Sequence, residues 1–332
     1  MGCYLVTGAA GFIASRVSEL LLADGHSVVG VDNLNDAYDV RLKLWRLAQI
    51  EGKPGFRFHK LDITSRPELT GLFAGRTAAG EPRFDAVINL AARAGVRYSV
   101  ENPWVYFETN GIGTLNLLEL SREYEIGKFV LASSSSLYGK ANPLPYREDQ
   151  NTDQPLSPYA ASKKAAEALC YTYHHLHGTD VTVFRYFTVY GPAGRPDMMP
   201  FRLVQWISEG RPVTVYGDGR QSRDFTYVDD IARGTIAGLR AVGYEVINLG
   251  SDQPVVLADA ITCVESLTAS EARLVYRPAH PADVPATWAD IGKAEKLLDW
   301  RPLVAFPEGV ARLVNWYRAN RDWASSIPTL AQ

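Results

Sequence analysis

The sequence predicts an α/β protein: a doubly wound parallel sheet of about seven strands, followed by a smaller mixed α/β domain at the C-terminus. Two observations predict this fold. Short apolar segments alternate with helical patterns throughout the first half of the chain, and in most of these segments the apolar residues are consecutive rather than alternating with polar ones. Continuous apolarity indicates strands that are covered on both faces, which is typical of parallel sheets built from right-handed βαβ units.

Six apolar segments of the first half are expected to form strands, and the first helix is expected over residues 12–24. The predicted strands cover residues 4–7, 27–32, 56–62, 86–90, 129–133 and 181–186. A further strand over residues 245–249 is expected to return to the same sheet. Near the middle of the chain a turn-rich segment opens a mixture of helices and short strands. We therefore expect one domain over residues 1–185, to which later segments such as 225–250 return, and a second over residues 186–332.

The composition is that of an ordinary globular protein. The chain has 332 residues, of which 46% are hydrophobic and 21% charged, and its formal net charge is -3. This charge predicts no general electrostatic attraction to nucleic acid or to an anionic membrane. Anionic ligands must therefore be held by local features of the chain.

Cysteines, histidines and apolar runs each exclude a class of protein. The three cysteines, Cys3, Cys170 and Cys263, are too widely spaced to indicate a disulfide framework or a metal site. His174 and His177 share a helix face, but no cysteine or carboxylate motif accompanies them, so we expect no metal. No apolar stretch is long enough to cross a bilayer, and the first residues form a predicted strand rather than a signal peptide. We expect a cytoplasmic protein without a nucleic-acid or membrane partner.

A glycine-rich turn follows the first predicted strand and opens the first predicted helix, in the run from Gly8 to Ala14. Gly8 permits a tight turn, and Gly11 lets a pyrophosphate approach the helix N-terminus, where amide N–H groups and the helix dipole favour anions. Asp32 ends the second predicted strand, where a carboxylate bonds an adenosine ribose and repels a 2′-phosphate. Asn33 follows it, and no arginine is adjacent. Turn, helix and carboxylate together predict a Rossmann-type site for NAD rather than NADP.

Asp62 and Ile63 end the third predicted strand. In a Rossmann-type sheet this position lies beside the adenine of the dinucleotide, so the two residues are candidates to flank that ring. A plain strand end explains the pair equally well.

Two segments of the chain match the pattern Tyr-x-x-x-Lys. Tyr124 and Lys128 straddle a predicted helix end and the fifth predicted strand, so we interpret them as structural. Tyr159 and Lys163 follow Pro158, which suits a helix start, and their spacing places both side chains on one helix face. A lysine cation beside a phenol favours the phenolate and lowers the pKa of the tyrosine toward the working pH. We therefore expect Tyr159 to act as a general base that later returns its proton.

Residues 133–136 are all serine and close the fifth predicted strand, at the carboxyl edge where doubly wound sheets bind ligands. A serine-rich loop is the alternative interpretation, and for this run alone it would be preferred. The glycine turn, the serines and the pair Tyr159 and Lys163 occur in the order that catalysis requires. We therefore expect Ser134 to bond the substrate oxygen that Tyr159 deprotonates.

These features together resemble the extended short-chain dehydrogenase/reductases, over essentially the whole chain. The motifs that carry the resemblance are residues 7–14, 89–92, 133–136 and 159–163. Ala14 stands where the family pattern has its third glycine, a substitution that the family commonly carries. The resemblance implies a tightly bound NAD, regenerated in each cycle, and catalysis by Tyr159, Lys163 and Ser134. The cofactor-binding residues that it implies are Gly8, Gly11, Phe12, Ile13, Asp32, Asn33, Asp62, Ile63, Leu90, Ala91, Ala92, Asn110, Tyr159, Lys163 and Tyr186.

Two later segments are similar to parts of UDP-sugar epimerases that hold the nucleotide. Residues 223–230 imply that Arg223 contacts the diphosphate. Residues 213–216 are similar to the strand that holds a uracil ring, which implies contacts by Thr214 and Tyr216.

A third segment, residues 283–287, resembles another nucleotide-side segment of these epimerases and implies a contact by Asp283. His280 stands where UDP-galactose epimerases carry an arginine. Diphosphate binding by Arg223 is therefore better supported than any contribution from His280.

Finer features resemble the UDP-glucuronic acid 4-epimerase branch of the family, in residues 32–39, 93–99 and 184–198. UDP-galactose epimerases usually carry a lysine in the place of Ala94 and an asparagine in the place of Thr188. Hydroxyl donors suit a bound carboxylate. The residues implied to bind the sugar and its carboxylate are Ser134, Ser135, Ser136, Thr188 and Arg195.

Two arginines have a less certain assignment from the sequence. Arg195 is in a position to reach either the sugar carboxylate or the nucleotide. Arg97 is a weaker substrate-binding candidate, because an exposed arginine after a strand is usually just solvated.

The resemblance implies a specific reaction. Tyr159 removes the C4 hydroxyl proton while C4 gives a hydride to NAD, the 4-keto sugar turns over, and the hydride returns to its other face. The expected activity is NAD-dependent 4-epimerisation of UDP-glucuronic acid to UDP-galacturonic acid. UDP-glucose/UDP-galactose 4-epimerase is the alternative within the class, and a non-catalytic NAD-binding module is the alternative outside it. Dehydration is not expected, because Ser136 and Leu137 stand where dehydratases carry Asp-Glu.

Members of the family pair through two helices per subunit, expected here over residues 104–124 and 159–176, which implies a homodimer. The apolar positions that fit this interpretation are Leu115, Leu117, Leu118 and Leu120. Burial against the subunit's own sheet explains many of them equally well.

Overall fold

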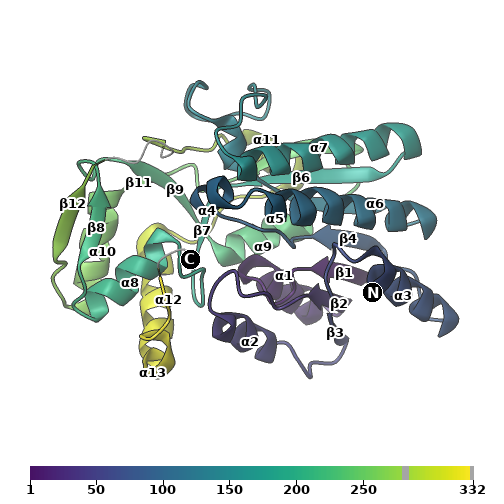
Figure 1. The fold of residues 1–332 in the computed structure, drawn as a ribbon, viewed down its shortest axis with the longest axis horizontal. Coiled ribbons are helices and arrows are strands. Elements are labelled where there is room, and N and C mark those ends of the chain that lie inside the picture. The colour runs from purple at the N-terminus through teal and green to yellow at the C-terminus, as the bar shows by residue number, and fades with distance from the viewer. Residues whose placement is uncertain (279–283, 330–332) are drawn as a thin grey trace.

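The computed structural model describes residues 1–278 and 284–329. Its centre is a seven-stranded sheet with the order β10-β6-β5-β4-β1-β2-β3, in which every pair of neighbouring strands is parallel (Figure 1). The strands are β1 Cys3–Thr7, β2 Ser27–Asp32, β3 Phe56–Lys60, β4 Ala86–Asn89, β5 Lys128–Ser134, β6 Asp180–Tyr186 and β10 Tyr244–Leu249. The predicted fold class is confirmed, and so is the return of the segment near residue 245 to this sheet.

Helices cover both faces of the sheet, as the unbroken apolarity of its strands requires. The helices packed in the larger hydrophobic core, on one face, are α1 Phe12–Ala23 and α9 Val228–Ala237. Those packed in a second core, on the other face, are α3 Arg66–Ala78, α6 Gly113–Glu123 and α7 Pro158–His177. A further helix, α2 Val40–Ala48, follows the long loop after β2.

The helix α7 has well-defined ends. Ser157 precedes it, and its hydroxyl accepts a hydrogen bond of 3.2 Å from the Ala160 N–H, while Pro158 occupies the first turn. Gly178 ends the helix in the left-handed conformation, with φ of 68°, which glycine adopts without strain. These signals hold Tyr159 in the first turn of a rigid helix.

A helical stretch connects β4 to β5, and it is not uniform. Its parts are α4 Val96–Glu101, α5 Trp104–Tyr106, the π-helical turn η1 Phe107–Ile112 and α6. The single helix expected over residues 104–124 is thus widened by a π turn, a feature frequent at functional sites. Leu117, Leu118 and Leu120 are buried in the subunit's own core, and Leu115 packs against it. These leucines therefore support the monomer's sheet rather than a partner.

The C-terminal part combines two small sheets with helices, on the left in Figure 1. The strands β7 Thr188–Tyr190, β9 Ser222–Tyr227 and β11 Pro254–Val256 form one sheet, and β8 Val213–Tyr216 pairs in parallel with β12 Leu274–Arg277. The helices are α8 Met199–Ser208, α10 Leu257–Thr268, α11 Gly292–Leu298, α12 Phe306–Ala319 and α13 Arg321–Ala324.

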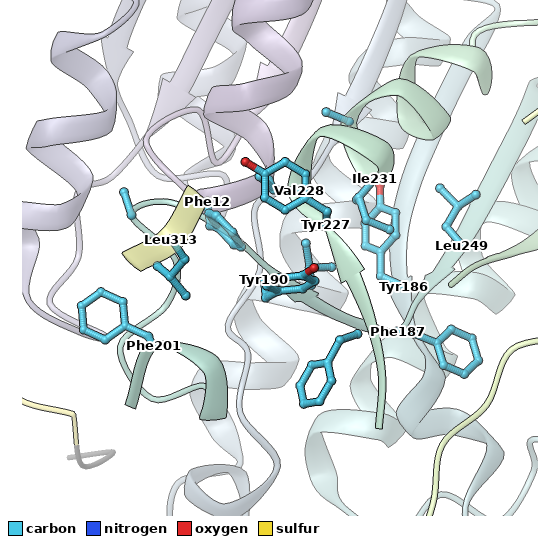
Figure 2. Packing of buried hydrophobic residues seen from close by; sticks show 14 of the residues in the cluster. Phe12, Tyr186, Phe187, Tyr190, Phe201, Tyr227, Val228, Ile231, Leu249 and Leu313 are labelled. Atoms are coloured by element: carbon cyan, nitrogen blue, oxygen red, sulfur yellow. The ribbon is translucent and has the colours of Figure 1, made fainter. Parts of the chain in front are cut away.

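One hydrophobic cluster runs through both parts of the chain (Figure 2). The ring of Tyr190 lies 5.7 Å from that of Tyr227 and 5.2 Å from that of Phe306, measured between centroids. Phe12 of α1 and Phe201 of α8 belong to the same cluster. The parallel sheet and the C-terminal part therefore share a core.

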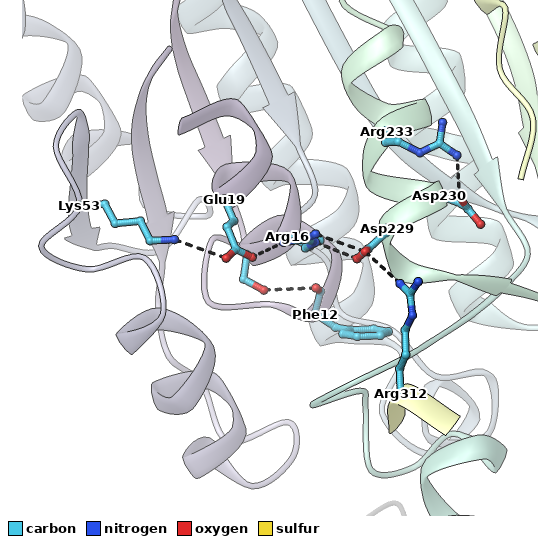
Figure 3. Close-up of polar contacts among 9 residues, drawn as sticks. Phe12, Arg16, Glu19, Lys53, Asp229, Asp230, Arg233 and Arg312 are labelled. Atoms are coloured by element: carbon cyan, nitrogen blue, oxygen red, sulfur yellow. Dashed lines mark hydrogen bonds and ion pairs between the residues drawn. The ribbon is translucent and has the colours of Figure 1, made fainter. Parts of the chain in front are cut away.

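A surface network of charges joins α1 to α9 and α12 (Figure 3). Arg16 Nε donates to Asp229 Oδ1 over 2.7 Å, and Arg312 Nη1 lies 3.8 Å from Asp229 Oδ2. Arg16 also pairs with Glu19, one turn along its own helix, over 2.5 Å. Pairs this close to solvent contribute about 0–1 kcal/mol each, so the shared apolar core contributes more to the union of the two parts.

The first Tyr-x-x-x-Lys segment is divided between two elements. Tyr124 ends α6 and Lys128 opens β5. Lys128 Nζ donates to the Thr182 hydroxyl over 2.8 Å and to the Arg240 carbonyl over 2.7 Å, and it pairs with Asp180. Lys128 is therefore held by contacts of its own on β5, and it belongs to a different element from Tyr124. Along residues 1–278 and 284–329, no helix is both long and apolar enough to cross a membrane.

Candidate active site

A cavity of about 780 Å³ follows the carboxyl ends of the central strands, where doubly wound sheets bind ligands. A cavity of this volume has room for a large ligand. Most of the residues singled out from the sequence line it. They are Gly8, Gly11, Phe12, Ile13, Asp32, Asn33, Asp62, Ile63, Leu90, Ala91, Ala92, Arg97, Ser134, Ser135, Ser136, Tyr159, Lys163, Tyr186, Thr188, Arg195, Tyr216 and Arg223.

The glycine turn is packed too closely for larger side chains. Gly8 has a φ of +71°, and a Cβ there would lie 2.9 Å from the backbone of Ala91. A Cβ on Gly11 would lie 2.7 Å from the Gly8 carbonyl oxygen. Within the described chain no side chain caps the first turn of α1, so its amide N–H groups are open to the cavity. These donors at a helix N-terminus fit a pyrophosphate.

Asp32 is held rigidly at the end of β2. Its Oδ2 accepts from the Ala10 N–H over 3.2 Å, and its Oδ1 accepts from the Leu34 N–H over 2.8 Å. Lys43 Nζ, on α2, lies 3.6 Å from Oδ1, and both side chains are 6% exposed. The carboxylate lines the cavity beside the glycine turn, the geometry that an adenosine ribose requires.

Asp62 and Ile63 line the same end of the cavity. Burial raises the pKa of Asp62, but hydrogen bonds from the Thr64 N–H and from the Asn33 amide outweigh it and lower the pKa below its ordinary value. The Asn33 bond, 2.6 Å long, ties the loop after β2 to the loop after β3. Asp62 and Ile63 therefore form a preformed wall of the cavity, against which a flat ring can lie.

Tyr159 and Lys163 both line the cavity from one face of α7. Burial lowers the pKa of Lys163 to about 8, against an opposing effect of Glu167. Its Nζ donates to the Ala132 carbonyl over 2.8 Å. Burial raises the pKa of Tyr159, and a hydrogen bond with Ser134 and the charge of Arg195 act against this. The expected lowering of the tyrosine pKa by Lys163 is therefore not the dominant effect in this structure, because Tyr159 is buried and its stabilising partners are Ser134 and Arg195.

The serine run divides between the core and the cavity. Ser133 Oγ donates to Glu167 Oε1 over 2.5 Å, toward the interior of the protein. Ser134 Oγ bonds Tyr159 and accepts from the Ser136 N–H over 3.1 Å, at the start of the short helix η2 Ser135–Tyr138. The expected closeness of Ser134 to Tyr159 is present.

A buried ion pair supports the catalytic helix from below. Arg185 on β6 donates to both carboxylate oxygens of Glu167 on α7, over 3.0 and 2.9 Å, and each side chain is 5% exposed. The Arg185 guanidinium also lies 4.9 Å from the ring centroid of Tyr138. Sequence reasoning missed this pair, because Glu167 belongs to no motif and the segment 184–198 gave Arg185 no partner.

Arg195 lines the cavity, and its charge acts on Tyr159. It donates to the two oxygens of Asp197 over 3.1 and 2.6 Å, and 24% of its side chain remains exposed. Burial lowers the pKa of Arg195, but Asp197 outweighs it and raises the pKa above the ordinary value. The charge of Arg195 acts to lower the pKa of both Tyr159 and Tyr106. The guanidinium is therefore a permanent positive charge near the candidate base.

Arg97 and Tyr216 come together from α4 and β8. The Arg97 guanidinium lies 4.8 Å from the Tyr216 ring centroid, a cation–π contact, and both residues line the cavity. Arg223 of β9 lines the same end, where its Nη1 donates to the Ser222 carbonyl over 2.8 Å. Arginines here fit an anionic ligand.

Two predicted residues of the described chain, Asn110 and Thr214, are not among those that line the cavity. Asn110 is 1% exposed and bonds the Arg93 backbone at both N–H and carbonyl, over 2.9 and 3.0 Å, and the Ser162 hydroxyl. It links the π turn to the loop after β4 and to α7. Thr214 shares the face of Tyr216 on β8 but is not among the residues that line the cavity. Asp283, with its neighbour His280, lies outside the described residues.

Two further residues singled out from the sequence, Tyr186 and His174, bond other parts of the protein. Tyr186 lines the cavity, but its hydroxyl bonds the Thr235 hydroxyl over 2.8 Å, so only its ring faces a ligand. His174 Nδ1 bonds the Thr179 carbonyl over 2.9 Å. Within residues 1–278 and 284–329, no group of three or more potential metal ligands is present.

Sequence reasoning missed several residues of the cavity wall. The most telling are Tyr38, Lys43, Asp197, Met198 and Arg202. Lys43 is a buried position of α2, and only the apolar–polar pattern of that short helix offered a signal. Asp197 lies two positions after Arg195. This spacing alone does not predict that the two side chains form a bidentate ion pair.

Comparison with known proteins gives a consistent result. Residues 4–250 match the NAD dependent epimerase/dehydratase family. A protein of Thermodesulfobacterium geofontis named UDP-glucuronate 4-epimerase is 55% identical over 98% of this chain and 99% of its own length. A probable UDP-glucuronate 4-epimerase of Rhizobium meliloti is 39% identical over 96% of this chain and 97% of its own length.

Solved structures agree with the sequences. UDP-glucuronic acid 4-epimerase from Bacillus cereus, in complex with UDP-glucuronic acid and NAD, has a TM-score of 0.88 and 35% identity, over 96% of this chain and 99% of that one. UDP-glucose 4-epimerase from Thermotoga maritima, with UDP-glucose, has a TM-score of 0.87 and 30% identity over the same shares. With its parallel sheet, glycine turn and Tyr159–Lys163 pair, the chain belongs to the NAD dependent epimerase/dehydratase family.

Proposed function

We propose that the protein interconverts UDP-glucuronic acid and UDP-galacturonic acid by inverting C4 of the sugar, with NAD as its cofactor. One observation carries this proposal: Tyr159, Ser134, Arg195 and the glycine turn line one cavity, and both Ser134 and the cation of Arg195 act to lower the pKa of Tyr159. A base alone suits many oxidations, whereas a permanent cation beside it suits an anionic sugar. The names and bound ligands of the similar proteins support the same substrate.

The cofactor half of the cavity fits NAD on its own geometry. We propose that the open amides after Gly11 bind the pyrophosphate and that Asp32 bonds the ribose hydroxyls. Asp62 and Ile63 are proposed to flank the adenine. When bound, NAD supplies reversible hydride acceptance, and the epimerisation as a whole consumes none of it. The further cofactor contacts proposed are Phe12, Ile13, Asn33, Leu90, Ala91, Ala92, Asn110, Lys163 and Tyr186.

We propose that two regions of the chain bind the cofactor and the sugar nucleotide. Residues 1–185 are proposed to hold NAD, with residues 225–250 contributing β10 to the same sheet. Residues 186–332 are proposed to hold most of the UDP-sugar. Residues of both regions line one cavity, which supports this assignment.

The proton is handled by a short relay of side chains. Tyr159 accepts the proton of the C4 hydroxyl as the C4–H bond breaks, and the hydrogen bond with Ser134 holds its oxygen in place. Lys163, whose pKa is about 8, remains mostly cationic at pH 7 and favours the phenolate form. After the 4-keto sugar has turned over, Tyr159 returns the proton to the same oxygen while C4 is reduced on its other face.

The carboxylate needs its own restraint. The 4-keto sugar of a uronic acid is a β-keto acid, which loses carbon dioxide when the bond to the carboxylate is perpendicular to the carbonyl plane. We propose that Ser135, Ser136, Thr188 and Arg195 hold the carboxylate away from this geometry. Hydroxyl and guanidinium donors are the groups that bind a carboxylate most strongly.

The nucleotide is proposed to occupy the outer end of the cavity. Arg223 is assigned to the diphosphate, and Tyr216, with Arg97 against its ring, to the uracil. Thr214 and Asp283 remain proposals from the sequence. Stacking of a base on an aromatic ring that carries a cation on its other face is a strong arrangement for a nucleotide.

A homodimer is also proposed. Large apolar side chains are exposed on the helical stretch after β4 and on α7. They are Val100, Trp104, Phe107, Ile112, Tyr171 and Leu176. Exposed apolar groups clustered on one set of helices favour association with a second copy.

The test is direct. Purified protein is incubated with UDP-glucuronic acid, without added reductant, and the C4 stereochemistry is followed by proton NMR. Appearance of UDP-galacturonic acid supports the proposal, and the Tyr159→Phe variant should be slower by about 10²–10⁴-fold. An unchanged spectrum with NAD present contradicts the glucuronate assignment. UDP-glucose is then the next substrate, and a protein inert toward both is a binding module.

A further inference from the structure

Arg46 is a buried cation with an unusual set of partners. It lies on the inward face of α2 and is 3% exposed. A buried guanidinium is normally balanced by a carboxylate. Within the described part of the chain, Arg46 forms no ion pair, and its guanidinium donates to backbone carbonyls and one phenol instead. A buried cation without a carboxylate partner lowers the stability of the protein. Its presence therefore calls for a functional reason.

One side of the Arg46 guanidinium contacts the glycine turn. Arg46 Nη1 donates to the Ala10 carbonyl over 3.2 Å. Ala10 lies between Gly8 and Gly11, and its N–H donates to Asp32. Arg46 is therefore attached to the segment that is proposed to hold the pyrophosphate.

The other side contacts the turn before Arg195. Arg46 Nε and Nη2 donate to the Ala193 carbonyl over 2.8 and 2.6 Å, and Nη2 reaches the Gly194 carbonyl over 3.3 Å. Ala193 has a φ of +50°, a left-handed conformation that alanine rarely adopts. The turn is thus a strained one that Arg46 restrains, and Arg195 is its next residue.

Tyr38 completes the contact from the cavity side. Its hydroxyl accepts from Arg46 Nη1 over 2.7 Å, and the guanidinium lies 5.4 Å from its ring centroid. Tyr38 lines the cavity and belongs to the loop between β2 and α2. The likeness of residues 32–39 to glucuronate epimerases, which no catalytic role explained, thereby gains a physical context.

We propose that Arg46 is a positioning residue that fixes the Ala193–Arg195 turn against the glycine turn, so that Arg195 faces the sugar carboxylate. This inference rests on the proposed function, because it assigns Arg195 to that carboxylate. Only a forked, planar donor bonds both turns at once, since the donors of a lysine radiate from a single atom. Loss of the fork frees the Arg195 turn while leaving the ends that bind adenosine and uracil intact.

The experiment compares two ligands that differ in the sugar. NAD-loaded wild-type protein and the Arg46→Lys variant are titrated by calorimetry with UDP-glucuronic acid and with UDP. We expect UDP-glucuronic acid to bind the variant about tenfold more weakly, and UDP to change by less than about twofold. A purely structural role would weaken both ligands alike.

Arg76→Lys is the matched control. Arg76 also donates to a backbone carbonyl, that of Pro82 over 2.8 Å, and lies 4.5 Å from the ring centroid of Phe84. Arg76 lies near the end of α3, contacts Cys3 at the amino end of β1, and is not among the residues that line the cavity. We expect the control to bind both ligands as the wild type does.

A second variant keeps the inference testable if Arg46→Lys does not fold. Arg46→Ala is titrated with and without millimolar methylguanidinium, which should restore the preference for UDP-glucuronic acid over UDP. Equal weakening of both ligands, unchanged binding in Arg46→Lys, or failure of methylguanidinium to restore the preference overturns the positioning role. A wild-type protein that binds UDP-glucuronic acid no better than UDP overturns the proposed function and this inference together.

Discussion

Lys163 is a cation placed where a cation is costly. Burial lowers its pKa to about 8, against an opposing effect of Glu167. A lysine in an unfolded chain has a pKa of about 10.4. Between roughly pH 8 and pH 10, the unfolded chain therefore holds more protons than the folded one, and stability rises with pH through this window. Below about pH 8 both states are protonated, and the full cost of burying the charge is present.

We expect this cost to appear in a pH series of the Lys163→Met variant. Between pH 7 and pH 9, the free energy of unfolding of the wild type should rise by about 1.4 kcal/mol relative to that of the variant. Denaturant titration at both pH values measures the difference. Lys164→Met, which alters the half-exposed neighbour, is the control and should follow the wild type. Parallel pH curves for wild type and Lys163→Met would show that Lys163 titrates as an ordinary lysine.

Asp32 and Lys43 together predict how cofactor choice can change. The Asp32 carboxylate repels a 2′-phosphate, whereas Lys43, 3.6 Å away, attracts one. In the Asp32→Asn variant the repulsion is gone and the cation remains, so affinity for NADP should rise by about tenfold or more while affinity for NAD falls. Fluorescence titration with both dinucleotides measures the ratio. Adding Lys43→Met should remove the gain, and an NADP affinity that ignores both changes would contradict this account.

The predictability of single residues depended on whether a motif determines where they point. Gly8 and Gly11 were found because a close approach admits no side chain, and Tyr159 because a helix face aligns it with Lys163. Arg46 belongs to no motif, and its direction depends on how α2 packs on two distant turns. The tyrosine pKa was also wrong in direction, because burial is a property of the folded protein.

At the scale of elements, α7 and β6 are joined by the pair of Glu167 and Arg185. Both side chains are almost fully buried, and two hydrogen bonds connect them. Since Glu167 also accepts from Ser133, this carboxylate links the catalytic helix to β5 as well. The relative position of Tyr159 and Ser134 therefore depends on a contact below the cavity.

Removing one member of that pair should be severe. In Glu167→Gln, Arg185 remains as a buried charge without its carboxylate, which costs about 3–5 kcal/mol. The double variant Glu167→Gln with Arg185→Met has no such charge and should recover a large part of the loss. Thermal unfolding of the two proteins measures this. A double variant as unstable as the single one would show that the pair contributes through packing alone.

Elements were predictable where hydrophobicity alone determines them. Most strands of the central sheet were found because both of their faces are buried, whereas the edge strand β3 has no buried residue and ends earlier than predicted, at Lys60. The π turn η1 was not found, because no local pattern distinguishes it from an α-helix. Of the short strands of the C-terminal part, β8 was found at residues 213–216 through the resemblance, whereas three-residue strands such as β7 have no periodicity to detect.

At the scale of the whole molecule, the proposed homodimer depends on exposed apolar side chains. Trp104 is 77% exposed, and Phe107 and Ile112 follow it along the same helical stretch. The leucines first considered for a partner are buried in the subunit's own core, because they face the sheet. The sequence left two explanations open for these leucines, and their burial supports the one in which they pack against the subunit's own sheet.

A charge at the centre of this surface should separate the subunits. We expect wild-type protein to elute as a dimer and Trp104→Glu as a folded monomer, because desolvating a carboxylate in an apolar interface is costly. Light scattering after size-exclusion chromatography measures the mass. Leu303→Glu is the control, since Leu303 is 73% exposed before α12, outside these helices. Equal masses for wild type and Trp104→Glu would place any interface elsewhere.

The order of strands in the central sheet has a consequence for synthesis on the ribosome. The edge strand β10 begins at Tyr244 and pairs with β6, which ends at Tyr186. While the intervening residues are being translated, a nascent chain presents β6 as an unpaired edge, which is a template for pairing with other chains. That edge closes once β10 has been synthesised and has paired with β6. Slow translation between the two strands should therefore increase the need for chaperones, although β6 has a neighbour on each side in the finished protein.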